Sequence, residues 1–310
     1  MIKKLNKKLL IVVIISASAS SVNANLIENT DITLRAGISK QDFMFDTPAA
    51  HSILDWQGEN IGVGLDVKYD LTDNLFTDLE LDYSKVKGGE AHDDDISNKG
   101  YIYSKGGVEG ETKDLKLSFG YKFDLDNVGV DSFSIAPTVG GFYKNINYHS
   151  ENKTQLGYTL VNLPPYGNIP IPYQSSSSGI TNETDSDIIG VSFGLKLESK
   201  DPIKEKSVIK FDFLLPVHYV GKMTWHKRVP VLNWELENRK KFDPKNNNGF
   251  RIKYEKGYKI NNSMIDYLKF YSSYEKIIIK NLKETEPNWN YKGKGRVEFE
   301  AFAMGIGLEF

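Results

Sequence analysis

Apolar and polar residues alternate with a period of two through much of the chain. Between Ile61 and Tyr69, valine and leucine alternate with glycine and charged residues, and after Leu71–Asn74 the alternation resumes over residues 77–84. A period of two places successive side chains on opposite faces of a strand. The pattern therefore predicts a hairpin of antiparallel strands, each with one apolar and one charged face.

The same alternation recurs in residues 115–123, 189–197, 209–215 and 302–310. Such strands suit either a soluble sandwich, with the apolar face in the core, or an outer-membrane barrel, with that face in lipid and the other lining a closed polar interior. The last strand ends in Phe310, on the apolar face. A terminal aromatic of this kind is similar to the signal by which outer-membrane barrels are recognised for assembly, so we expect a barrel, with the sandwich as the alternative.

Short and long connections alternate along the chain, as expected when short turns face the periplasm and long loops face the exterior. The third long connection is rich in proline over residues 163–173, and because proline removes ladder donors we expect an exposed loop there. Five long connections imply ten strands. They are expected near residues 45–52, 88–110, 149–187, 225–248 and 281–294.

The first 24 residues are predicted to be a signal peptide. Four lysines between Lys3 and Lys8 precede the apolar run Leu9–Ile15 and the small-residue cleavage pattern Val22–Ala24. An apolar run of this length is too short for a transmembrane helix, which needs about 20 residues. Residues 25–310 are expected to form a single barrel domain in the bacterial outer membrane.

Composition narrows the choice of partners and chemistry. The net charge is −2, and it falls to −6 when the four leader lysines are removed, which argues against a nucleic-acid partner. The chain has no cysteine, so thiolate chemistry is excluded. None of its five histidines has a spacing such as His-x-x-x-His, and we expect no metal and no cofactor.

One candidate for catalysis lies in the second long connection, where Asp93 and Asp95 fall on the same side of an extended segment. Two such carboxylates can activate a water or bind Ca²⁺, and the alternative is a solvated acidic loop. His226 is a second candidate, as an acid or base at the barrel rim, with a plain surface histidine as the alternative.

Basic and aromatic residues gather in the fourth long connection. Cations at an outer rim can hold the phosphates of lipopolysaccharide, and solvated loop charge is the alternative. These residues are Trp225, Lys227, Arg228, Trp234, Arg239, Lys240 and Lys241.

The amino-terminal part of the chain resembles the omptins, which are ten-stranded outer-membrane endopeptidases and adhesins. The resemblance covers residues 29 to about 95 and implies an omptin-like barrel in which Asp93 and Asp95 position the attacking water. Beyond residue 95 the likeness is mainly in strand order and loop lengths. The matching segments are Asn29–Leu34, Gly37–Lys40, Ser52–Trp56 and Gly88–Gly89 ahead of the aspartates.

The chain departs from the omptin pattern in its second half. Omptins carry an Asp-x-His pair on the fourth outer loop, but here Thr224 stands at the acid position if His226 is the histidine. The lipid A-binding segment retains Tyr143 but has Asn145 and Asn147 where omptins carry an acid and an arginine. We therefore expect a divergent member in which endopeptidase activity is doubtful.

Three functions follow as hypotheses: an omptin-like adhesin or aspartic endopeptidase, a passive pore whose lumen inward charges fill with ion pairs, and a structural surface antigen. The expected partners are outer-membrane lipid and lipopolysaccharide, the latter as a structural ligand, and a host or other extracellular protein.

Overall fold

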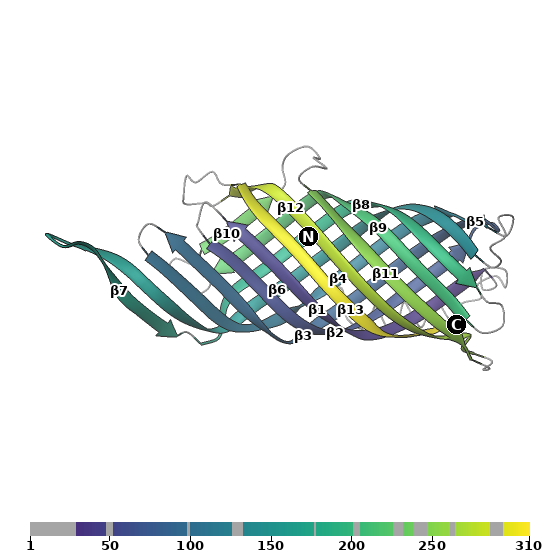
Figure 1. The fold of residues 1–310 in the computed structure, drawn as a ribbon, viewed down its shortest axis with the longest axis horizontal. Coiled ribbons are helices and arrows are strands. Elements are labelled where there is room, and N and C mark those ends of the chain that lie inside the picture. Colours follow the sequence, from purple (N-terminus) through teal and green to yellow (C-terminus); the bar gives the residue numbers. More distant parts are fainter. Residues whose placement is uncertain are drawn as a thin grey trace. The chain divides into compact units, whose positions relative to one another are not determined.

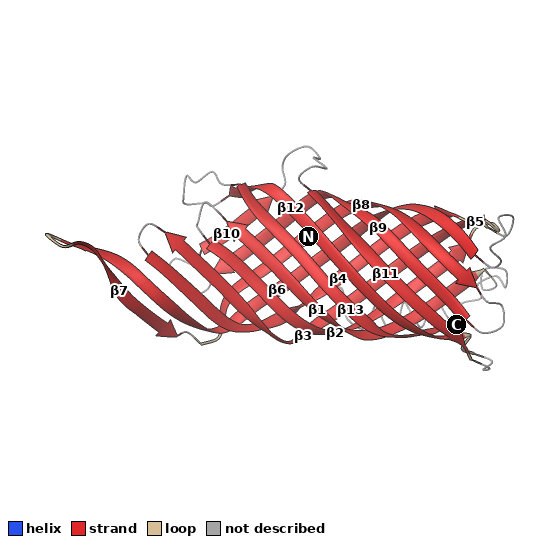
Figure 2. Cartoon of the chain, in the orientation of Figure 1, coloured by secondary structure: helices blue, strands red, loops and turns tan. Residues whose placement is uncertain are grey.

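The computed structural model describes residues 29–47, 52–97, 100–125, 133–176, 178–200, 205–225, 232–237, 247–260, 264–285 and 294–310. The described secondary structure consists of strands, as Figure 2 shows, and no described helix has the length and hydropathy of a membrane span. The predicted signal peptide, residues 1–24, lies outside the described residues.

Ten long strands form one closed antiparallel barrel within the compact unit Asp31–Phe310 (Figure 1). Each pairs with its neighbours in sequence, and β13 pairs with both β12 and β1 to close the ring. The predicted ten-stranded fold is confirmed. The strands are β1 (Thr30–Thr47), β2 (Ser52–Asp70), β3 (Leu75–Ser97), β4 (Gly100–Tyr121), β6 (Phe133–Leu163), β8 (Ile180–Lys200), β9 (Glu205–Trp225), β11 (Asn247–Lys259), β12 (Tyr267–Thr285) and β13 (Lys294–Glu309).

Three short strands supplement the ring. β5 (Phe123–Asp124) and β7 (Gly167–Ser176) both pair with β6. β10 (Leu232–Glu237) pairs with both β9 and β12. These two strands flank β11 in the ring and are both longer than β11, so β10 connects them beyond its end. We call the end of the barrel with the turn Leu71–Asn74 the turn end, and the opposite end, where β6 and β7 form a hairpin, the hairpin end.

Near the turn end, the barrel has apolar residues outside and charged residues inside. On β4, Leu115, Leu117 and Phe119 face outward, while Lys116 and Ser118 are buried. This outward band runs from Leu115 on β4 to Phe123 on β5, and a strand needs about nine to eleven residues to cross a membrane. It includes Ile32, Leu34, Ile38, Ile61, Val63, Tyr121, Val139, Ile189, Phe193, Leu195, Ile209, Phe211, Phe213, Ile252, Tyr254, Phe270, Phe302, Met304 and Ile306.

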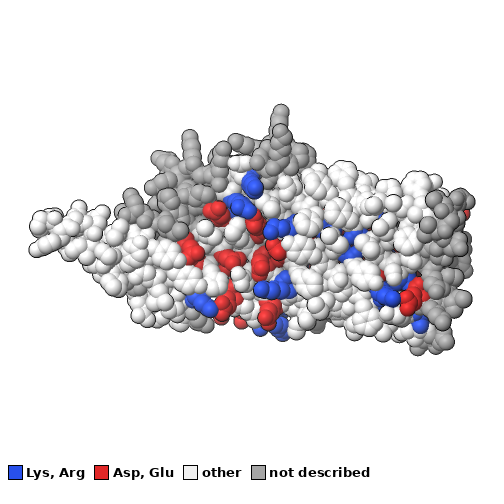
Figure 3. All heavy atoms as spheres, in the orientation of Figure 1, with Lys and Arg blue, Asp and Glu red and all other residues white. Residues whose placement is uncertain are grey.

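Toward the hairpin end this arrangement is inverted. On β1, Lys40 faces outward whereas Phe43 and Phe45 are completely buried inside. Figure 3 shows one side of the barrel, where charged side chains gather on the wall toward the β7 side. The interior of this half is an apolar core made of Phe43, Phe45, Leu54, Trp56, Val86, Ala91, Val108, Phe142, Ile146, Tyr148, Ile188, Leu214, Tyr219, Met223, Ile277, Ile279, Leu282, Val297 and Phe299.

Among the described residues, most of the charged interior predicted from the sequence lies in the turn-end half, although Asp93 and Lys153 are also buried toward the hairpin end. The hairpin-end half is built like a water-soluble barrel, with a polar wall around an apolar core. Its strands are far longer than lipid requires, since β3 has 23 residues and β6 has 31. We call the part of the barrel wall between the outward apolar band and the hairpin end the projecting wall.

The expectation of a proline-rich loop at residues 163–173 was wrong. β6 continues to Leu163, turns at residues 164–166, and pairs with β7 from Gly167 onward. Pro170 and Pro172 lie two positions apart, so both ring nitrogens lie along the same edge of β7. β7 has only β6 as a partner among the described strands, and an edge strand tolerates proline when its nitrogen faces away from the ladder.

Other connections expected to be long are also largely strand. Most of residues 88–110 belong to β3 and β4, which leave only residues 98–99 between them. The sequence pattern weakens there because β-bulges shift the register between Lys85 and Glu90 and between Lys105 and Gly107. A bulge changes which residues face inward, so alternation is interrupted although the strand continues.

Candidate functional site

The turn-end lumen is crossed by ion pairs between opposite walls. Glu80 of β3 contacts Lys210 of β9 and Arg251 of β11, each at 3.1 Å, although these strands lie four and five places away around the ring. Asp212 of β9 contacts Lys116 of β4 at 2.5 Å. The charges are satisfied by each other, which is the arrangement that buried ions require.

A second group of ion pairs lies alongside the first. Lys144 of β6 bridges Asp114 at 2.6 Å and Glu275 of β12 at 3.0 Å. Lys253 contacts Asp66 at 2.9 Å, and its side chain is only 3% exposed. In a water-filled channel such charged side chains would be exposed. The sequence-based idea that inward charges fill the lumen with ion pairs therefore agrees with the arrangement of these residues.

The aspartate pair lies at the hairpin end, on the part of β3 within the projecting wall. Asp93 points inward and is buried, and its Oδ2 atom is 3.0 Å from Nζ of Lys153 on β6. Lys153 also donates to the side-chain oxygen of Asn182 (2.7 Å) when the Asn182 amide is oriented to donate to the Thr181 carbonyl. Asp93 is therefore held by a buried cation inside the wall.

Of the predicted catalytic set, the structure describes the side chain of Asp93 alone. Asp95 lies on β3 two positions beyond Asp93, paired in register with Ile102 of β4, and its side chain lies outside the described ones. His226 is outside the described residues. β9 ends at Trp225, which pairs in register with Asn182, the residue next to the Asp93–Lys153 pair. The catalytic role of Asp93, Asp95 and His226 stays a prediction.

Tyr143, the candidate lipid A contact, lies on the outer face of β6 where the apolar band meets the projecting wall. Its hydroxyl donates to Asp187 of β8 at 2.6 Å. Asn145, the next outward residue on β6, donates to Asp185 and Asp187. This patch is acidic, whereas lipid A phosphates are bound by cations. The basic residues predicted to hold lipopolysaccharide at 227–228 and 239–241 lie outside the described residues.

Two contacts on the outer face of the projecting wall shift pKa values. A hydrogen bond from Lys105 holds the pKa of the exposed Glu90 carboxyl below its usual value. The Tyr101 hydroxyl donates to Asp94 at 2.8 Å, and this bond raises the pKa of the phenol, because ionisation would place a phenolate beside a carboxylate.

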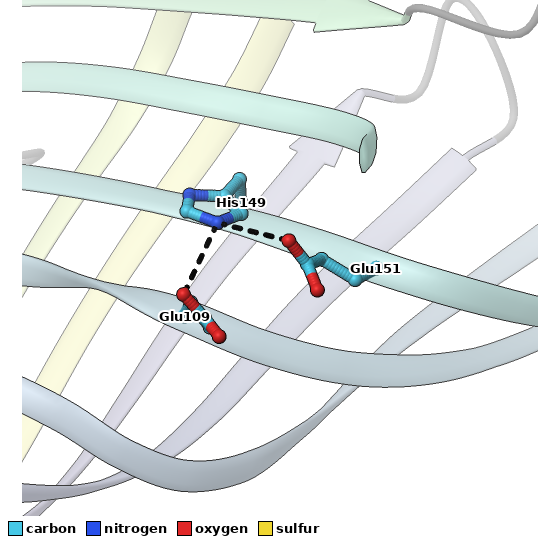
Figure 4. A group of neighbouring side chains, drawn as sticks. All are labelled: Glu109, His149 and Glu151. Atoms are coloured by element: carbon cyan, nitrogen blue, oxygen red, sulfur yellow. Dashed lines mark ion pairs between the residues drawn. The ribbon is translucent and has the colours of Figure 1, made fainter. Parts of the chain in front are cut away.

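A cluster that the sequence analysis missed lies on the same wall (Figure 4). His149 of β6 points toward two carboxylates: its Nε2 atom is 3.7 Å from Glu109 of β4 and 3.5 Å from Glu151, two residues along β6. Glu109 and His149 are paired directly across the two strands. The available signal was the pair His149-x-Glu151, because an i, i+2 spacing puts both side chains on one face of a strand.

The β6–β7 hairpin extends from this end of the barrel as a separate arm (Figure 1). No charged residue occurs between Lys153 and Glu183. Large apolar side chains are exposed along the arm, and Tyr166 at its turn is 80% exposed. They are Leu156, Tyr158, Val161, Leu163, Tyr166 and Ile171. Exposed apolar surface of this extent marks an interaction site more often than a solvated loop.

Comparisons with known proteins agree with the barrel. The family described as Protochlamydia outer membrane protein, Pom, matches residues 46–308. No curated protein matches the chain in sequence. The outer membrane protease OmpT of Escherichia coli is similar in structure, with a TM-score of 0.70 and 9% identity over 91% of this chain and 97% of that one. The omptin resemblance is therefore confirmed for the fold alone.

Other solved structures are much less similar. A Pseudomonas aeruginosa FadL homologue has a TM-score of 0.31 and 7% identity, covering 91% of this chain and 90% of its own. A major outer membrane protein of Thermus thermophilus has a TM-score of 0.33 and 12% identity, covering 89% of this chain and 99% of its own.

Proposed function

The chain belongs to the Pom family of Protochlamydia outer membrane proteins, and we propose on that premise that it is a closed barrel that acts as an adhesin through its β6–β7 hairpin. The observation that carries the proposal is the uncharged arm with its exposed aromatic and aliphatic side chains. In an outer-membrane barrel, short turns face the periplasm, so the hairpin end faces outward. The partner is an extracellular protein with an apolar, uncharged contact surface.

The interior supports a role in display and not in transport. Ion pairs cross the turn-end lumen, and an apolar core fills the hairpin-end half. Together they make a rigid base for the arm. Planar-bilayer recordings of the purified protein are expected to show no steady conductance, and a stable solute-dependent current would favour the pore instead.

The surroundings of Asp93 favour an adhesin over an endopeptidase. A general base needs a free lone pair near its water, whereas this carboxylate is buried against Lys153. Cleavage of a dibasic-peptide library by lipopolysaccharide-reconstituted protein, abolished by Asp93→Ala and Asp95→Ala, would overturn this preference.

The adhesin proposal is tested with two exposed apolar residues at opposite ends of the barrel. Tyr166 is 80% exposed in the hairpin and Met264 is 78% exposed at the turn end. Cells displaying the full-length protein are incubated with host extracellular-matrix proteins. Binding is expected to fall with Tyr166→Ser and with deletion of residues 160–172, and to persist with Met264→Ser. Unchanged binding after the deletion would show that the hairpin is not the adhesive site.

A further inference from the structure

We propose that Glu109, His149 and Glu151 form a binding site for a divalent transition-metal ion, with Zn²⁺ as the best fit, on the outer face of the projecting wall. One imidazole nitrogen and two carboxylate oxygens are borderline donors of the kind that zinc takes. Figure 4 shows the three side chains converging from two adjacent strands. The proposal is independent of the adhesive role of the hairpin.

The spacing of the donor atoms fits a tetrahedral ion. Zinc with bonds of about 2.0–2.2 Å holds its ligand atoms roughly 3.3–3.6 Å apart. In the cluster, His149 Nε2 lies 3.5 Å from Glu151 Oε1 and 3.7 Å from Glu109 Oε2, and all three donor atoms lie within 4.8 Å of one another. Small side-chain rotations are enough to complete the coordination.

The backbone holds the ligands in place. Glu109 and His149 are directly paired between β4 and β6, and Glu151 shares the outward face of β6 because it is two residues further on. On the other side of β6, Glu183 of β8 is paired directly with His149 and also faces outward. Glu183 thus lies beside the cluster, and a water would fill the fourth coordination position.

Charge provides a second argument for a cation. Two other outward glutamates on these strands have a lysine partner: Glu111 pairs with Lys113 at 2.6 Å and Glu90 with Lys105 at 2.7 Å. Among the described residues, no lysine or arginine forms an ion pair with Glu109 or Glu151. Among the described residues these two carboxylates share His149 as their basic partner, and a bound divalent cation would remove the repulsion between them.

The site was not expected from the sequence, because its residues do not have the i, i+4 histidine spacing that metal ligands have on a helix. On a sheet, ligands come from positions i and i+2 of one strand and from the directly opposite residue of the next. A metal ion here would tie β4 to β6 and stabilise the projecting wall, because it binds the folded state and not the separated strands.

The experiment uses the full barrel, purified without a polyhistidine tag, stripped with a chelator and titrated calorimetrically with ZnCl₂. Saturable binding of one Zn²⁺ per chain is expected, together with an intense tetrahedral visible spectrum when Co²⁺ is used. His149→Ala, Glu109→Gln and Glu151→Gln are each expected to weaken zinc binding by at least about tenfold. Binding is expected to weaken at acidic pH, where protons compete for the imidazole.

His218→Ala is the matched control, because His218 is exposed on the outer face of β9 and lies outside the cluster. It is expected to leave zinc binding unchanged. Heat-modifiable migration on gels shows that each variant is folded. Absence of saturable zinc binding, equal binding by His149→Ala and the parent chain, or a preference for Ca²⁺ or Mg²⁺ over Zn²⁺ would each overturn the proposal.

Discussion

Charged residues in this barrel differ in how deeply they are buried, and burial decides how much each ion pair contributes to the stability of the fold. The Asp93–Lys153 pair is buried, with side-chain exposures of 6% and 4%, whereas the Lys113–Glu111 pair is on the surface. Leaving one member of a buried pair without its partner costs far more than removing a surface pair. Sequence spacing identified Asp93 as a candidate base but not Lys153, because the lysine lies 60 residues away on another strand.

Replacing Lys153 by methionine is expected to lower the free energy of unfolding by about 3–5 kcal/mol, because the buried Asp93 carboxylate loses this cation. The double variant Asp93→Asn, Lys153→Met is expected to recover most of this loss. The surface control Glu111→Gln is expected to cost under about 1 kcal/mol. Urea unfolding in lipid vesicles, followed by tryptophan fluorescence, measures all three. A double variant as unstable as the sum of its parts would contradict the interpretation.

Tyr101 gives a prediction about pH. Its pKa is raised above 10.0 by the bond to Asp94, so the stabilisation from that bond is complete below about pH 10 and is lost as pH rises through the raised pKa. Asp94→Asn is expected to shift one tyrosine ionisation to lower pH. The readout is phenolate absorbance during alkaline titration. In a Tyr101→Phe background, Asp94→Asn should produce no shift, and a shift there would assign it to another tyrosine.

At the scale of elements, the β6–β7 hairpin shows where sequence reasoning failed and why. Pro170 and Pro172 argued against a strand, yet both fit in β7 because it pairs on one side only. Sequence alone does not show whether a strand is central or at an edge. The two ring nitrogens also protect the arm, because an open edge with free donors tends to pair with other chains.

Restoring the donors at this edge is expected to promote self-association. Pro170→Ala with Pro172→Ala returns two N–H groups to the open side of β7, and the purified protein is expected to form larger species by edge pairing. Light scattering coupled to size-exclusion chromatography gives the mass. Ile171→Ala, between the two prolines, keeps both ring nitrogens and is expected to stay at the parent mass. A mass unchanged by the double variant would mean that the prolines do not guard the edge.

At the scale of the whole molecule, period-two alternation predicted antiparallel strands, the five long connections predicted ten of them, and the terminal aromatic residue predicted their closure into a barrel. The inversion between the two halves was present in the sequence but not recognised. On β1 the outward apolar residues Leu34 and Ile38 stand at even positions, whereas the inward Phe43 and Phe45 stand at odd positions. The period stays at two but its phase shifts by one residue, so the period alone does not show that the apolar side chains have moved to the other face of the strand. The Glu109–His149–Glu151 cluster was missed for a related reason, since its residues on β4 and β6 meet only through strand pairing.

Because the outer face is apolar in one half of the barrel and polar in the other, the same substitution is expected to lower the free energy of unfolding by different amounts at two positions on one strand. Val63 and Gln57 both face outward on β2, but Val63 is in the apolar band and Gln57 is in the projecting wall. Val63→Lys is expected to lower the free energy of unfolding in lipid vesicles by about 2–4 kcal/mol, because the ammonium must enter hydrocarbon. Gln57→Lys is expected to change it little, since water surrounds that position. Equal costs at both positions would mean that lipid covers the whole barrel and that the polar wall does not project beyond the membrane.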